Sequence, residues 1–83
     1  MNDDERIGKL RDLVDQTAER LMYDRSLSLP EAIRLTLETR RRAEKIIPDM
    51  MDRYDLIYES RFQRLIWQFV LPRTARGGEN ADG

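Results

Sequence analysis

The tetrapeptide Ser28-Leu29-Pro30-Glu31 constrains the fold more than any other feature of the sequence. Serine at an N-cap, proline in the first turn and glutamate three residues after the serine form a capping box, which satisfies free backbone N–H groups at the start of a helix. The pattern therefore predicts a helix that begins at Leu29. Pro48 lacks a backbone N–H and disfavours helical geometry at Ile47, so we expect this helix to end there.

Apolar residues recur at three- and four-residue steps in this segment and in the segments on either side of it, which is typical of amphipathic helices. The first segment covers residues 3–23 and opens with three carboxylates, which suit the positive end of a helix dipole. The last covers residues 49–71 and is expected to stop at Pro72. The stripes expected to face the core are Ile7, Leu10, Val14, Thr17 or Ala18, and Leu21; Leu29, Ala32, Ile33, Leu37, Ala43 and Ile47; and Met51, Tyr54, Tyr58, Phe62, Leu65 and Phe69.

These segments predict an all-α fold, an antiparallel three-helix bundle with helices at about 3–23, 29–47 and 49–71. A chain of 83 residues supports one domain, which we assign to residues 1–72. Residues 73–83 are small, polar and rich in glycine, so we expect a flexible tail. The alternative joins the second and third helices through a kink at Pro48 into one bent rod, which would need a partner chain.

The chain contains no histidine and no cysteine. This composition excludes a disulfide, a Cys/His zinc site, a thiol nucleophile and a histidine general base. The carboxylates lack the spacing of a calcium loop, and Gly8 stands alone rather than in a glycine-rich phosphate loop. We therefore expect no enzymatic activity, no cofactor and no metal. The acidic N-terminus and the absence of a 20-residue apolar run predict a cytoplasmic protein without membrane contact.

The third segment carries more apolar residues than one helix face can bury. Projected at 100° per residue, a second group lies across the helix from the predicted core stripe. An apolar surface left over on a small domain is typical of a protein interface, and tryptophan is enriched in interface hot spots. We expect a homodimer formed through this second group, which comprises Leu56, Trp67, Val70 and Leu71.

Residues 25–48 hold six basic and three acidic side chains, although the whole chain has a net charge of −1. The basic residues are spaced for ordinary ion pairs on a solvated helix face, which is the interpretation we favour. The alternative is a small nucleic-acid-binding regulator that contacts phosphates through this helix. Its candidate contacts are Arg34, Arg41, Arg42 and Lys45.

Arg40 falls near the middle of the apolar arc of the second helix, where its guanidinium needs an acceptor. We expect a buried ion pair with Glu59 that fixes the register of two helices. Asp52, which lies in the third helix with Glu59, and Asp15 of the first helix are the other candidate acceptors.

Two short segments are similar to known families. Residues 28–34 resemble the opening of the second helix in ribbon-helix-helix repressors, a dimeric DNA-binding family. Members of that family have a basic strand ahead of their helix pair, where residues 3–23 of this sequence are expected to form a helix. Residues 10–15 resemble the first-helix opening of helical chorismate mutases, which have three helices and dimerise. The second resemblance implies a third hypothesis, an enzyme in which Arg11, Arg40 and Glu59 converge on one pocket. Each similarity is too short to assign a family.

Overall fold

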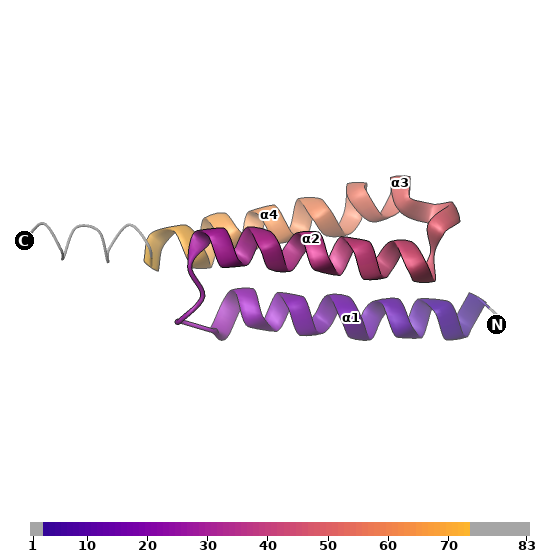
Figure 1. Ribbon diagram of the computed structural model, residues 1–83, viewed down its shortest axis with the longest axis horizontal. Helices are drawn as coiled ribbons and strands as arrows, with labels where there is room; N and C mark the ends of the chain where they lie inside the picture. Colours follow the sequence, from indigo (N-terminus) through magenta and orange to yellow (C-terminus); the bar gives the residue numbers. More distant parts are fainter. Residues whose placement is uncertain (1–2, 74–83) are drawn as a thin grey trace, which may run out of the picture.

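The computed structural model describes residues 3–73, which form three helices and, within that range, no strand. Figure 1 shows the first and third helices running in one direction and α2, between them in chain order, running in the other; the prediction of an all-α fold with three helices is confirmed. The third helix is continuous over residues 51–73 but changes type along its length. The elements are α1 (Asp3–Tyr23), α2 (Leu29–Ile46), a 3-10 turn η1 (Pro48–Met50), α3 (Met51–Tyr54), a π-helical turn η2 (Asp55–Glu59), α4 (Ser60–Leu65) and a second π-helical turn η3 (Ile66–Val70).

The capping box starts α2 where the sequence predicts. The Ser28 hydroxyl accepts a hydrogen bond from the Glu31 backbone N–H at 3.3 Å, and the Glu31 carboxylate accepts one from the Ser28 N–H at 3.2 Å. In the preceding turn, the Asp24 carboxylate accepts from the backbone N–H and the hydroxyl of Ser26 at 3.1 and 2.6 Å. These local bonds close the connection between α1 and α2 without help from the rest of the fold.

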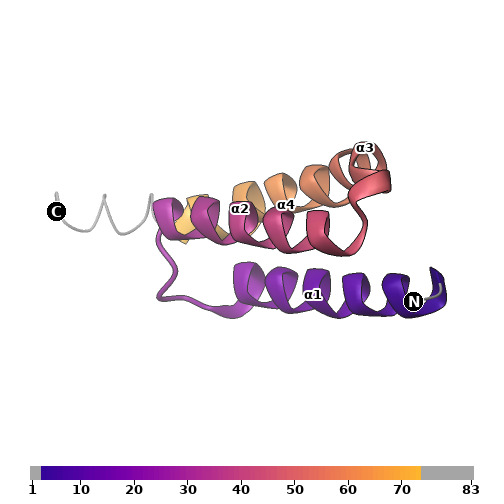
Figure 2. The ribbon, with the colours of Figure 1, turned by 45° about the vertical axis from the view of Figure 1, so that its right-hand side comes forward.

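Pro48 separates two helices. Ile47 leaves helical geometry at φ −131°, and α2 and the third helix then run side by side in opposite directions (Figures 1 and 2), which excludes the bent rod. Arg6 fixes this end of the bundle because its Nε donates to the Ile46 carbonyl at 3.1 Å and its guanidinium pairs with Asp49. The N-terminal part of α1 is thereby tied to the connection between the other helices.

The buried face of α2 differs from the predicted stripe. Ile33 and Leu37, expected in the core, are 47% and 52% exposed. The helix is rotated so that a stripe of smaller residues meets the other helices, and Arg40, within the predicted stripe, keeps part of its side chain in water. Small residues let two helix backbones approach closely, and α1 occupies that space. The buried residues of α2 are Ala32, Thr36, Thr39 and Ala43.

The core face of the third helix repeats every four residues rather than every 3.6. Tyr54, Tyr58, Phe62, Ile66 and Val70 follow this spacing, and all but the half-buried Tyr58 are buried. In a regular α-helix, residues spaced four apart would shift around the helix axis by about 40° with each repeat. The two π-helical turns hold extra residues and offset the drift. The prediction of an exposed Val70 is therefore wrong, because this side chain is 0% exposed in the core.

Pro72 does not stop the third helix, which continues through Arg73. Arg73 donates to the Leu21 and Met22 carbonyls at 3.4 and 3.3 Å, and so places a cation at the C-terminal end of α1, where the helix dipole favours it. Assigning Arg73 to the flexible tail is therefore wrong. Residues 74–83 of that predicted tail lie outside the described residues.

Candidate protein-binding face

An ion pair shows which side of the third helix faces α2. Arg40 donates from Nε to Asp55 Oδ1 at 2.9 Å and from Nη2 to Asp55 Oδ2 at 3.0 Å. The predicted partner, Glu59, lies one turn further along the third helix. Asp55 contributes most to the raised pKa of Arg40, and the charge of Glu59 makes a smaller contribution. The predicted link between the two helices thus exists, but its acceptor is Asp55 and both side chains are half exposed.

Three apolar side chains lie on the same side of the bundle as the Arg40–Asp55 pair. On the helical wheel of α2, Ile33 and Leu37 lie about 20° and 60° from Arg40, both on the same side of it, and they lie toward the N-terminus of α2. On the third helix, Trp67 follows the core residue Ile66 just as Asp55 follows Tyr54, and it is 72% exposed. The four-residue repeat therefore puts Trp67 on the α2 side, beside the first turns of α2. We call Ile33, Leu37 and Trp67, together with the Arg40–Asp55 pair, the α2–third-helix face.

The remaining predicted interface residues add no exposed side chain to this face. Leu56 is 75% exposed, but it lies a further 100° around the helix from Asp55 and points away from α2. Leu71 packs against the core and is half buried. Sequence reasoning missed Ile33 and Leu37 because both had been assigned to the core.

Two buried polar atoms stand at the inner edge of this face. Within residues 3–73, neither the Tyr54 hydroxyl nor Glu59 Oε2 has a hydrogen-bond partner, and both atoms are buried. Burial raises the pKa of the Glu59 carboxyl, and the negative charge of Asp55 raises it further, while Arg40 lowers it. Burial also raises the pKa of Tyr54, with a further contribution from Glu59. An unpaired buried donor and acceptor make this the polar centre of the face.

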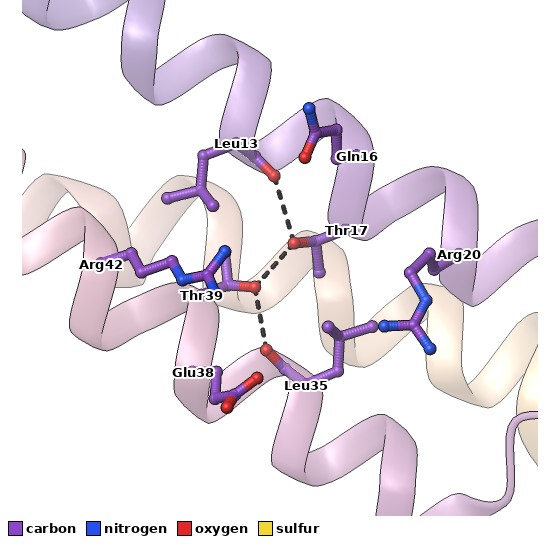
Figure 3. A pocket seen from close by; sticks show the side chains of 8 residues that line it. All are labelled: Leu13, Gln16, Thr17, Arg20, Leu35, Glu38, Thr39 and Arg42. Carbon is purple, nitrogen blue, oxygen red and sulfur yellow. Dashed lines mark hydrogen bonds between the residues drawn. The ribbon is translucent and has the colours of Figure 1, made fainter.

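The face between α1 and α2 has a different character. Its central hollow, about 110 Å³ in volume, lies over a contact between the Thr17 and Thr39 hydroxyls at 2.6 Å (Figure 3). Each hydroxyl also approaches a carbonyl of its own helix, Leu13 at 3.1 Å and Leu35 at 2.8 Å. Each hydroxyl has one hydrogen, so only two of these three contacts are hydrogen bonds at any moment: one threonine donates to the other across the helices, and the second donates to the carbonyl of its own helix.

The predicted nucleic-acid contacts are all exposed on α2. Arg42 lines the central hollow in Figure 3, opposite Arg20 of α1. Lys45 lines a second hollow with Arg6 and Lys9 of α1. Arg34 lines a third with Arg20, whereas Arg41 lines none of the three. The α1 side chains were missed because a helical wheel for α2 does not show which α1 residues will join it.

The geometry for the mutase-type hypothesis is incomplete. Arg40 and Glu59 lie close enough to influence each other's pKa. Arg11 is exposed on α1, and within the described part of the chain no hydrogen bond or ion pair joins it to either residue. None of these three residues lines any of the three hollows between α1 and α2.

The fold and these faces define a small all-α antiparallel three-helix bundle with two contrasting lateral surfaces. No family model matches the chain, and comparisons with curated proteins and with solved structures also find no match. Within residues 3–73, no helix has the length and apolar character needed to cross a membrane. The same residues contain no cluster of three or more carboxylates suited to a metal ion.

Proposed function

We propose that this protein is a non-catalytic interaction module that self-associates through its α2–third-helix face. The observation that carries the proposal is the exposure of Ile33, Leu37 and Trp67, at 47%, 52% and 72%, on one side of the bundle. Large apolar side chains gathered on one side of a small domain are typical of an interface, and tryptophan is a frequent hot spot. The cytoplasmic location of the protein remains a prediction from the sequence.

A second copy of the chain suits this face as a partner. A two-fold interface brings the same surface of both copies together, so it must be self-complementary. The face carries a cation and an anion side by side in the Arg40–Asp55 pair, with Glu59 one turn away, so a two-fold partner can match opposite charges at its rim. Small domains without disulfides or metals often gain stability from such association.

The first test is the molar mass by light scattering over a dilution series, with circular dichroism on the same samples. We expect a helical dimer that dissociates on dilution. Trp67→Ala should weaken dimerisation by more than about 1 kcal/mol, or roughly fivefold in the dissociation constant. A monomer at every concentration, with unchanged helicity, contradicts the proposal.

Matched variants locate the interface. The double variant Ile33→Ser/Leu37→Ser removes two exposed apolar side chains from the α2 side of the bundle. Leu56→Ser/Ile57→Ser removes two from the third helix away from Asp55, where both residues are also exposed. Only the first pair should shift the dissociation constant. If only the second pair does so, the dimer forms through the outer surface of the third helix instead.

A further inference from the structure

The face between α1 and α2 gathers basic side chains from both helices. Three hollows follow one another along it, and Arg20 lines both the central hollow and the one toward the start of α2. Six basic and three acidic side chains line these hollows. The basic residues are Arg6, Lys9, Arg20, Arg34, Arg42 and Lys45, and the acidic residues are Glu31, Glu38 and Asp49.

Two of the six basic residues already have ion-pair partners. Arg6 pairs with Asp49 and with Asp3, and Arg20 pairs with Asp24 at 3.5 Å. By contrast, the basic groups of Lys9, Arg42 and Lys45 make no ion pair or hydrogen bond within residues 3–73. Four basic side chains of the face then remain against the carboxylates of Glu31 and Glu38, so the face keeps a positive excess although the net charge of the chain is −1.

We propose that this α1–α2 face binds the phosphate backbone of duplex nucleic acid. The distance along α2 from Arg34 to Lys45 is about 17 Å at 1.5 Å per residue, which equals the axial rise of about five base pairs of a duplex at 3.4 Å each. None of the residues that line the three hollows is aromatic. The three hollows therefore offer no platform for stacking unpaired bases, which single-strand binders use; the exposed Tyr23 lines a separate hollow with Arg20 at the end of α1.

This surface lies on a different side of the bundle from the α2–third-helix face. Arg42 lies on the α1 side of α2, whereas Arg40 points toward the third helix. The two proposals are therefore independent, because nucleic-acid binding here leaves Ile33, Leu37 and Trp67 uncovered. A dimer would present two basic faces, which would raise its apparent affinity for a long duplex.

The test is fluorescence anisotropy with a labelled DNA duplex of about 20 base pairs, repeated at several salt concentrations. We expect binding at low salt that weakens steeply as salt rises, with a log–log slope near −3, because Lys9, Arg42 and Lys45 would each neutralise one phosphate and each phosphate contributes about −0.9. Arg42→Gln/Lys45→Gln should reduce the steepness of that slope by about 2. The control Arg61→Gln/Arg64→Gln changes the net charge equally on exposed positions of the third helix and should leave the slope unchanged.

Two results overturn the proposal. One is equal loss of binding in both double variants, which indicates a general charge effect rather than a site. The other is competition by poly-glutamate as effective as that by unlabelled duplex, which identifies an acidic protein as the partner. Circular dichroism confirms that each variant is folded. Light scattering reports dimerisation separately, so failure of one proposal does not affect the test of the other.

Discussion

The Arg40 guanidinium and the Asp55 carboxylate form two parallel hydrogen bonds, at 2.9 and 3.0 Å, that join α2 to the first π-helical turn of the third helix. Paired donors of this kind suit the planar fork of arginine, which lysine cannot reproduce. The pair fixes the register of the two helices next to the apolar residues of the proposed interface. It also gives stability a defined dependence on pH.

Asp55→Asn should lower the thermal stability slightly at neutral pH. The hydrogen bond from Arg40 holds the pKa of the Asp55 carboxyl below its usual range. The stabilisation is therefore complete above the unfolded-state pKa of about 3.9 and is lost as pH falls through the lower folded-state pKa. Melting curves of both proteins should converge at strongly acidic pH. A constant difference across the whole pH range would show that the loss arises from packing rather than from the ion pair.

Glu59→Gln should raise stability at neutral pH by about 1 kcal/mol, because it removes a charge from a half-buried carboxyl whose Oε2 lacks a partner. Burial raises the pKa of Glu59 above its unfolded value. The folded state consequently binds the proton more tightly, and the destabilisation present at high pH is relieved as pH falls through the folded-state pKa. Urea denaturation at several pH values should show the variant's advantage shrinking toward acidic pH. An advantage that persists unchanged there contradicts this account.

Thr39→Val should destabilise the bundle by about 1–3 kcal/mol despite its nearly identical shape. The substitution removes the hydroxyl that contacts Thr17 at 2.6 Å and puts a methyl group where only a hydrogen bond fits. Thr36→Val is the matched control, since the Thr36 hydroxyl bonds only the Ile33 carbonyl of its own helix. Denaturant unfolding should show a much smaller loss for Thr36→Val. Similar losses in both variants would mean that the contact between the two threonines adds nothing.

Gly8→Ala should stabilise the protein by about 0.5–1 kcal/mol, because alanine loses less backbone entropy than glycine in a helix. Gly8 lies within α1 and is exposed, and nothing lies within 4 Å of the position that an added Cβ would take. Its φ is not positive, so alanine fits without strain. Thermal denaturation provides the measurement. A lower melting temperature would contradict this account.

The sequence by itself determined where the helices begin and end. The capping box at Ser28 and the break at Pro48 act through atoms a few residues apart, so they hold in almost any tertiary setting. Pro72 marks the limit of such reasoning. A π-helical turn precedes Pro72, and the side chain of Arg73 reaches the C-terminal end of α1. Packing therefore overrides the local signal of the proline to end the helix.

The tertiary structure alone decided how each helix is rotated about its own axis. A helical wheel gives an apolar arc, but its exact orientation depends on how closely the neighbouring helices approach. Because the residues around Thr39 are small, α1 packs closely against this side of α2, and Ile33 and Leu37 remain exposed. The second π-helical turn brings Val70 into the core and leaves Trp67 exposed. Both proposed sites depend on these rotations, because each is built from side chains of two helices that only packing brings together.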